Sequence, residues 1–255
     1  MKHPSKTTSR PTEKEAKSTS PQFQTVRPAR AFEEIAAQIR TELAGGRLKV
    51  GSRLPSERVL AQQFDVSRNT LREALRSLEH AGLIRLQKGA TGGAFVSEGT
   101  GAAIINSMVD LYSVGSVTTS QLTEARIWLE SVIVREACER ATPESLEELQ
   151  ANIDQALRAS EAGDFQERSR LHLEFHKILT RMAGNPIMVI VMDGLLKVLE
   201  QFITTIGAYE NSFVFASRKR FMKHMMDKNP EAAVKEMESS LKRLQRVYLS
   251  RAEER

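Results

Sequence analysis

Residues 54–75 read LPSERVLAQQFDVSRNTLREAL, a stretch with the pattern of two short helices separated by a tight turn. The first helix is expected after Ser56 and the second after Ser67, since serine is a preferred residue at helix N-termini. In the second helix, three leucines recur at helical spacing and form one apolar stripe: Leu71, Leu75 and Leu78. These spacings predict a helix-turn-helix whose second helix buries one face in a core.

A second stripe on the same helix carries Arg68, Arg72 and Arg76, about 60° or more around the helix from the leucines. One interpretation is a solvated face that binds nothing. In a helix-turn-helix, however, the first turns of the second helix enter the DNA major groove, where arginine forms bidentate hydrogen bonds with guanine. We therefore expect DNA contacts from this end of the helix: Ser67, Arg68, Asn69, Thr70 and Arg72. Arg58, near the start of the preceding helix, is placed to contact the DNA backbone.

The segments on either side complete a larger unit. Residues 32–43 carry apolar side chains at helical spacing and are followed by a Gly-Gly pair that ends a helix. Downstream, residues 83–87 and 94–97 are short strand-like runs around a glycine-rich turn, which predicts a β-hairpin. Three helices and a hairpin predict a winged helix-turn-helix domain over residues 29–97.

The charge of the chain is concentrated at its front. Residues 1–97 carry 17 Lys or Arg against 9 Asp or Glu, whereas residues 98–255 carry 20 against 23. This asymmetry favours an acidic partner for the first part, nucleic acid above all. Residues 1–28 are rich in Ser, Thr, Pro and basic residues, and we expect them to form a disordered basic arm. That arm is either a solvated tail or an additional nonspecific attraction to phosphate.

The remainder of the chain has the pattern of a helical bundle. Residues 98–118 are rich in Gly, Ser and Thr and are predicted to link two domains, with an apolar patch at residues 104–111 that is suited to form a helix. The second domain is predicted over residues 119–255. Its expected helices end at Gly, Asn and Pro signals and cover residues 119–141, 143–161, 164–183, 186–208, 213–228 and 230–253. The expected fold is therefore mainly α, with an N-terminal winged helix-turn-helix and a C-terminal all-α helical bundle.

Cysteine content and hydropathy suggest where the protein works. Cys138 is the single cysteine, so neither an internal disulfide nor a thiolate metal site can form, which fits a reducing cytosol. The most apolar stretch, residues 187–199, is interrupted by Asp193 and Lys197 and falls short of a membrane span. No apolar segment follows the basic N-terminus, as a secretory signal requires. We expect a soluble cytoplasmic protein with no membrane partner.

The stretch LPSERVLAQQFDVSRNTLREALRSLEHAGLI at residues 54–84, with the later KGATGGAFV, resembles the DNA-binding domain of the GntR family of bacterial transcription regulators. The resemblance covers residues 32–96. It implies that five of the residues above contact operator DNA: Arg58, Ser67, Arg68, Thr70 and Arg72. It also implies that Lys88 and Gly89 form a wing tip that reaches the minor groove. Asn69 departs from the commoner Thr or Ala of the family, which bears on the base that is read.

The second domain resembles the all-helical effector domain of the FadR subfamily, called FCD. The resemblance rests on LTEARIWLESVIVREACERAT at residues 122–142 and FHKILTRMAGNPIM at residues 175–188. It implies a domain that dimerises and holds a small ligand, commonly an organic acid, inside its helix bundle. It also implies that Arg126 is a pocket residue. The alternative is a surface arginine paired with Glu130, four residues further along the helix.

Many members of that subfamily bind a divalent metal through an Asp, the histidine of the FH pair four residues later, and two histidines near the C-terminus. Here His176 is kept, but His172 stands at the Asp position, and the two later positions fall on Arg218 and Ser240. Two of the four ligands are absent and one of these is replaced by a cation, which opposes a metal. We therefore expect no metal or other cofactor.

His172 and His176, spaced by four residues, share one helix face. Three interpretations remain: hydrogen-bonded polar residues of the bundle, pocket residues without a metal, or metal ligands. Our hypothesis is that Arg126 and Arg218, aided by the two histidines, bind a carboxylate directly. His224 lies outside the family's ligand positions and is expected at the surface.

An enzymatic function is not expected. In a zinc protease helix the Glu directly follows the first His, whereas Glu174 comes two residues after His172 and points away from both histidines. Cys138 has no recognisable base, and no glycine motif for phosphate follows a strand.

The expected function is a homodimeric DNA-binding regulator, a repressor or an activator, whose affinity for operator DNA is set by a small organic acid. Two recognition helices related by a twofold axis would bind an inverted repeat. The alternative is an architectural DNA-binding dimer without an effector.

Overall fold

The computed structural model describes residues 30–89, 91–99, 101–207 and 211–253. The predicted basic arm at residues 1–28 lies outside them. Within the described ranges, no helix has both the length and the apolar character needed to cross a membrane.

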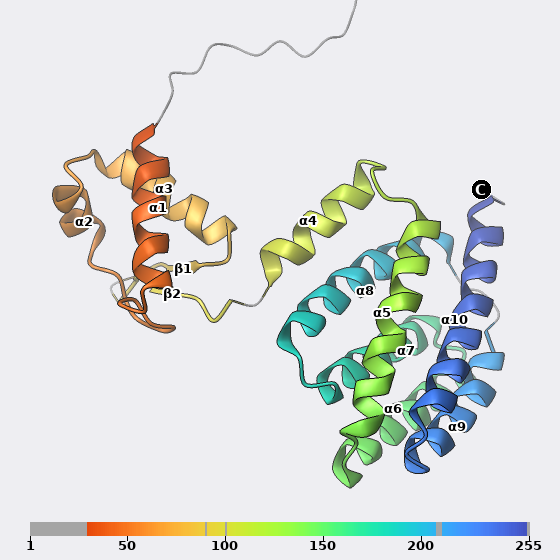
Figure 1. Cartoon of the computed structure of the whole chain (residues 1–255). Helices are drawn as coiled ribbons and strands as arrows, with labels where there is room; N and C mark the ends of the chain where they lie inside the picture. The colour runs from red at the N-terminus through yellow and green to blue at the C-terminus, as the bar shows by residue number, and fades with distance from the viewer. Residues whose placement is uncertain (1–29, 90, 100, 208–210, 254–255) are drawn as a thin grey trace, which may run out of the picture.

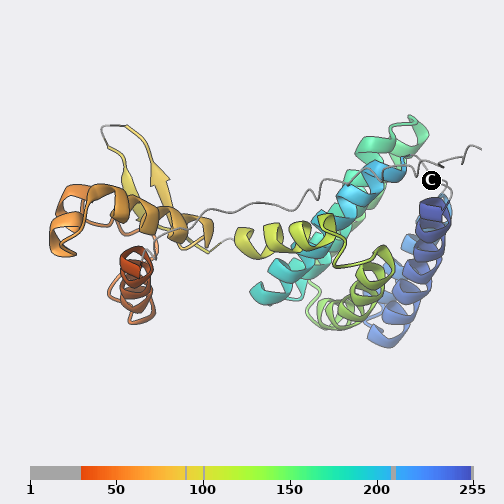
Figure 2. The same ribbon diagram turned by 90° about the horizontal axis from the view of Figure 1, so that it is seen from above.

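The first domain contains three helices and a two-stranded antiparallel sheet (Figure 1). Its elements are α1 (Arg30–Ala44), α2 (Glu57–Gln63), α3 (Arg68–His80), β1 (Ile84–Gln87) and β2 (Gly93–Val96). The strands pair in a register that places Ile84 opposite Val96. Figure 2 shows the two strands projecting beyond the helices as a wing. The predicted winged helix-turn-helix is confirmed, with strand bounds within one residue of those expected.

One apolar core holds this domain together. The leucine stripe of α3 is fully buried, with Leu71 and Leu78 both 0% exposed, and α1 packs against it through Ile35 and Ile39. Burying side chains of this size stabilises a fold by about 1.5–3 kcal/mol each. The backbone N–H of Leu86 donates to the Glu79 carboxylate at 2.8 Å, which ties the wing to the end of α3. The wing and α3 therefore form one rigid surface.

Helix α4 (Ala102–Ser113) occupies most of the predicted linker and leads to the second domain (Figure 1). It is apolar in composition, yet none of its residues is buried. It packs on α8 (Pro186–Ile206) where Gly194 leaves room for the Met108 side chain. Any larger residue at position 194 would collide with the Met108 sulfur, so this glycine determines how closely the two helices approach.

The second domain is a bundle of six helices. They are α5 (Thr119–Glu139), α6 (Pro143–Glu161), α7 (Phe165–Met182), α8, α9 (Phe213–Met226) and α10 (Pro230–Glu253). Side-chain caps explain where several of them begin. The Thr118 and Thr142 side chains form capping boxes with the third helical residue, and Asn185 accepts from two backbone N–H groups at the start of α8. The predicted mainly α fold is confirmed, and every helix of the bundle begins and ends within two residues of its predicted bounds.

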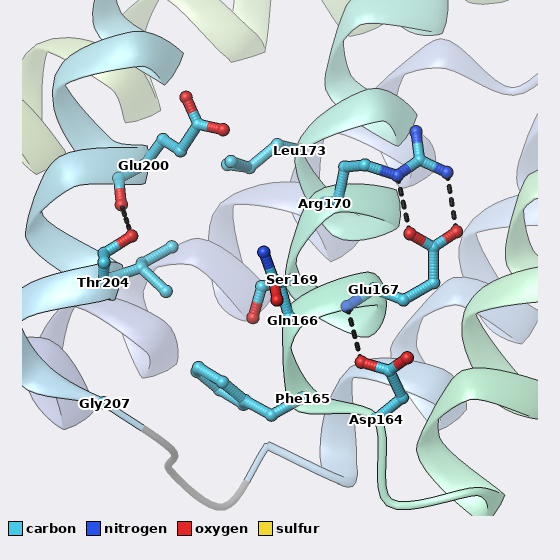
Figure 3. Close-up of a pocket in the computed structure, with 11 residues that line it drawn as sticks. Asp164, Phe165, Gln166, Glu167, Ser169, Arg170, Leu173, Glu200, Thr204 and Gly207 are labelled. Atoms are coloured by element: carbon cyan, nitrogen blue, oxygen red, sulfur yellow. Dashed lines mark hydrogen bonds and ion pairs between the residues drawn. The ribbon is translucent and has the colours of Figure 1, made fainter.

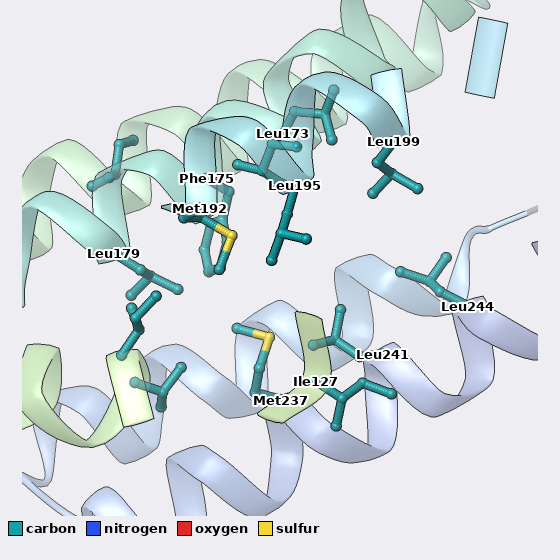
Figure 4. Close-up of a cluster of buried hydrophobic side chains, with 14 of the residues drawn as sticks. Ile127, Leu173, Phe175, Leu179, Met192, Leu195, Leu199, Met237, Leu241 and Leu244 are labelled. Carbon is teal, nitrogen blue, oxygen red and sulfur yellow. The ribbon is translucent and has the colours of Figure 1, made fainter. Parts of the chain in front are cut away.

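The bundle core brings together side chains from helices distant in the sequence (Figure 4). Phe175 and Leu179 of α7 meet Met192 and Leu199 of α8, and Leu241 of α10 closes the core from the other side. α5 packs along α10 and also against α7 and α8. Because α5 is surrounded in this way, polar residues on its inner face are buried as well.

Candidate functional site

Two regions carry the chemistry predicted from the sequence. The first is the face of α3 that points away from the core. Arg68, Arg72 and Arg76 are all exposed on it. At the N-terminus of α3, the Ser67 hydroxyl accepts the backbone N–H of Thr70 at 3.1 Å and lies 2.9 Å from the Thr70 hydroxyl. The expected division of α3 into a buried leucine face and an exposed arginine face is present.

A cleft of about 720 Å³ separates α3 from the wing. Arg72 and Arg76 line one wall, and Lys88 and Gly89 line the wall formed by the wing. Gly89 has φ +104°, a conformation that side-chain-bearing residues rarely adopt, so glycine suits this turn. The predicted contact residues of the helix and the wing therefore border one groove with basic walls.

Arg72 is held in place before any DNA is bound. Its Nε donates to the Glu57 carboxylate of α2 at 2.8 Å, with both side chains about half exposed. The pair lies at the surface, so it contributes little to stability, but it orients the guanidinium toward the cleft. Arg58, the next residue on α2, is exposed as its predicted role requires.

Arg53 is a basic residue of this surface that the sequence analysis missed. Its guanidinium donates to the Gly92 carbonyl at the base of the wing, and its backbone forms an isolated β-bridge with Phe95. Arg53 and Arg85 also lie over the Phe95 ring, with guanidinium carbons 5.8 and 4.9 Å from its centroid. Arginine on either side of an aromatic strand residue was the available sequence feature, since such residues stack.

The second region is a chain of charged side chains inside the bundle. Arg126 Nε lies 3.2 Å from Glu130 Oε1, and His176 Nδ1 lies 2.6 Å from the same oxygen. On its other side, His176 Nε2 lies 3.0 Å from Arg218 Nη2. All four residues are at least 95% buried. Arg218 is also positioned over the Phe175 ring, 3.2 Å from its centroid. We call these four residues the buried cluster.

Burial and neighbouring charges determine the protonation of the cluster. Burial lowers the pKa of His176 to about 3, and Glu130 only partly opposes this, so the imidazole is neutral near pH 7. Burial would raise the pKa of Glu130, but the contacts with His176, Arg126 and Arg218 outweigh it and lower the pKa to about 2. Burial lowers the pKa of Arg218 to about 9, so it remains charged. Two guanidinium groups and one carboxylate give the cluster one net positive charge.

These protonation states define the hydrogen bonds of His176. The neutral ring donates from Nδ1 to the Glu130 carboxylate and accepts at Nε2 from Arg218. Both ring nitrogens are therefore engaged within the protein.

A small cavity adjoins the buried cluster. Its volume is about 20 Å³, room for about one water molecule. Arg126, His176 and Arg218 line it together with His172 and Asn211. Burial, reinforced by Arg218, lowers the pKa of His172 to about 3. His172 Nε2 and Asn211 Oδ1 are buried atoms with no hydrogen-bond partner within the described ranges.

A wider cleft of about 630 Å³ lies beside the small cavity, between the start of α7 and the end of α8. Figure 3 shows Ser169 and Leu173 of α7 facing Glu200 and Thr204 of α8 across it. Ser169, Leu173 and Ile203 line both spaces, so their side chains form the wall between them. The small cavity is thus separated from an open cleft by a wall that is one side chain thick.

The cluster does not fit a divalent metal. His176 has both nitrogens engaged, and the Arg218 guanidinium occupies the space beside Nε2 where a cation would bind. Across the part of the chain that the structure describes, no group of three or more His, Cys, Asp or Glu side chains is placed to hold a metal ion. A cationic site of this kind suits an anion.

The structure brings together all four residues that the sequence placed in an effector pocket: Arg126, His172, His176 and Arg218. The alternative for Arg126 was half correct, because the pair with Glu130 forms but is buried rather than at the surface. Glu130 and Asn211 were missed. Glu130 occupies the same helical stripe as Leu122, Arg126 and Ala137, and its place among apolar residues could have shown that it is buried.

The buried histidines predict a marked loss of stability in acid. His176 is neutral when folded but protonates with an ordinary pKa of 6.5 when unfolded, so the unfolded state binds more protons below pH 6.5. The free energy of unfolding should therefore fall by about 2 kcal/mol for His176 alone between pH 6.5 and pH 5. Urea unfolding at several pH values measures this, and His176→Gln should flatten the dependence. His224→Gln, in the same domain, serves as the control, and equal slopes in both variants would contradict the prediction.

Comparison with known proteins agrees with this geometry. Residues 31–96 match the bacterial regulatory proteins of the gntR family, and residues 121–243 match the FCD domain. The putative L-lactate dehydrogenase operon regulatory protein of Escherichia coli K12 is 30% identical over 182 residues, 70% of this chain and 68% of that protein. The HTH-type transcriptional repressor NanR of Klebsiella aerogenes is 27% identical over 221 residues, 82% of each. A solved structure, Streptococcus agalactiae GntR, has a TM-score of 0.59 at 26% identity and covers 84% of this chain and 99% of that one.

A winged domain with an exposed arginine face, followed by a helical domain with a buried cationic cavity, defines a transcription regulator that binds DNA under the control of a small molecule. The chain belongs to the GntR family, in the FadR-like subfamily that carries an FCD domain.

Proposed function

We propose that the effector is an organic acid whose carboxylate binds between Arg126 and Arg218, and that its binding changes the affinity of the winged domain for operator DNA. The observation that carries this proposal is the single net positive charge of the buried cluster beside a cavity with unpartnered polar atoms. A buried uncompensated cation is unfavourable, and a bound carboxylate neutralises it. The name of the Escherichia coli relative refers to an operon for L-lactate dehydrogenase, and lactate is a small organic acid.

The small cavity must open for such an acid to bind, because about 20 Å³ cannot hold a carboxylate with its carbon chain. The wall formed by Leu173 and Ile203 is the part that can yield toward the cleft beyond it. Ile203 belongs to α8, and α8 packs against α4 at Gly194. Displacement of α8 would therefore move α4, which leads to the winged domain. This route couples the two regions through helices that touch.

A thermal-shift screen of small organic acids, followed by operator binding with and without the best acid, tests this function. A ligand at one hundred times its dissociation constant stabilises the folded protein by about 2.7 kcal/mol, which gives a readable rise in the unfolding midpoint. If no acid raises the midpoint, the alternative of an architectural DNA-binding protein without an effector gains support. An acid that stabilises the protein but leaves operator affinity unchanged would contradict the regulatory part of the proposal.

The same contacts support a regulator rather than an enzyme. Neither nitrogen of His176 is free to act as a general base. Glu174 pairs with Arg181 at 3.1 Å and faces away from the cluster. Cys138 is buried, and its burial raises the pKa of the thiol, which makes it a poor nucleophile.

We also propose that the protein acts as a homodimer on an inverted repeat. Trp128 and Val132 lie one turn apart on α5 and are 65% and 52% exposed, and α4 exposes Ile104 and Leu111. Large apolar side chains exposed on neighbouring helices are typical of an interface with another chain. A second copy that covers them would place two copies of α3 for two operator half-sites.

The dimer can be tested with its own tryptophan. Trp128 is the single tryptophan of the chain, so its fluorescence should shift to shorter wavelength as the protein concentration rises and the dimer forms. Val132→Asp should keep this reporter, abolish the shift and sediment as a monomer. Leu157→Asp, at an exposed leucine of α6, is the matched control and should still dimerise. A dimeric Val132→Asp protein would remove this face of α5 from the interface.

A further inference from the structure

The small cavity next to the buried cluster has features that a carboxylate alone does not satisfy. Asn211 is 1% exposed and its Oδ1 has no partner within the described ranges. A buried acceptor without a hydrogen bond is costly, so the site is incomplete until a donor reaches it. A carboxylate offers only acceptors. The ligand must therefore carry a donor as well as its negative charge.

We propose that the effector is a 2-hydroxy monocarboxylic acid and that Asn211 is the residue that selects its hydroxyl group; this inference rests on the function proposed above. The hydroxyl donates to Asn211 Oδ1, and His172 Nε2, which lines the same cavity and also lacks a partner, is its second contact. The volume of about 20 Å³ is that of one water molecule and equally suits one hydroxyl.

The position of the hydroxyl on the acid follows from the size of the cavity. Arg126 and Arg218, which bind the carboxylate, line the same small space as Asn211. The two functional groups of the ligand therefore lie within a few ångströms of each other, which places them on adjacent carbon atoms. The rest of the carbon chain extends past Leu173 and Ile203 into the wider cleft.

Charge distinguishes the hydroxyl from the other donor that a small acid can carry, an ammonium group. The buried cluster has two guanidinium groups and one carboxylate, and its histidines are neutral. A zwitterionic amino acid would bring a cation into a site that is already positive and would leave the net charge uncompensated. One carboxylate with a neutral hydroxyl compensates the charge and completes the hydrogen bonds. A dicarboxylate would leave a net negative charge.

The experiment compares acids that differ in one substituent. Calorimetry with the full-length protein uses lactate, propionate and alanine, which share one carbon skeleton, and the corresponding four-carbon and six-carbon sets. In at least one set the 2-hydroxy acid should bind about tenfold or more tightly than the other two, because only it completes the buried hydrogen bond. Asn211→Leu should remove this preference and still bind the unsubstituted acid. Asn106→Leu, the same change at an exposed position of α4, should keep it.

The outcomes separate this inference from the proposed function. Equal affinity of wild type for 2-hydroxy and unsubstituted acids would overturn the hydroxyl assignment and leave the acid-binding site in place. A preference that persists in Asn211→Leu would overturn the role of Asn211. Binding of no acid in any set would remove the proposed function together with this inference. Thermal unfolding of each variant verifies that it folds, and Asn211→Ala, which creates no new contact, replaces the leucine variant if that one does not.

Discussion

Arg218→Met should lower the affinity for organic acids by on the order of 100-fold while operator binding in the absence of acid stays unchanged. Arg218 is buried, charged and placed against His176 and the Phe175 ring. Loss of one partner from a buried charge pair costs about 2–5 kcal/mol, and here that partner is the cation that faces the ligand. Methionine keeps most of the side-chain volume, so the bundle should fold. Isothermal calorimetry with the best acid of the screen measures the change.

Arg220→Met provides the matched control for this substitution. Arg220 lies on the same helix, two residues further on, but it is exposed and pairs with Glu236 at 2.8 Å. Its replacement should leave acid affinity within about twofold, as expected for an exposed ion pair. Equal affinities of wild type and Arg218→Met for the acid would show that Arg218 is not part of the binding site.

Arg68→Ala should weaken operator binding by about 5- to 150-fold, the effect of one lost bidentate contact with a base. Arg68 is exposed at the first position of α3, directly after the Ser67 cap, which is the end of a recognition helix that enters the major groove. Binding to unrelated DNA should change much less, because that binding depends on phosphate contacts. Fluorescence anisotropy with operator and unrelated duplexes at fixed salt measures both affinities.

Arg76→Ala is the control on the same helix. Arg76 lies two turns deeper than Arg68 and should contact at most a phosphate, so its loss should weaken both duplexes alike and reduce the salt dependence slightly. If Arg68→Ala bound operator as tightly and as selectively as wild type, the mode of DNA recognition described for α3 would be wrong.

Much of the fold could be predicted because its determinants are local. Caps such as Thr142 before Pro143, and Asn185 before Pro186, define helix ends through hydrogen bonds within a few residues, and they lie in the structure where the sequence placed them. The buried leucines and exposed arginines of α3 follow from helical spacing alone. Arg53 shows the limit of such reasoning, because its contacts with Gly92 and Phe95 join segments about forty residues apart.

The buried cluster separates what the sequence determined from what only the tertiary structure decided. Sequence spacing placed Arg126 and Glu130 one turn apart and therefore predicted their pair. Whether that pair lies in water or inside the protein depends on how α7 and α10 cover α5, which no local pattern specifies. Packing brought His176 and Arg218 to the same carboxylate, and the exclusion of water lowered the pKa of His176 and left one uncompensated positive charge. Local hydrogen bonds and side-chain periodicity thus determined the helices, whereas burial in a low dielectric determined the chemistry of the site between them.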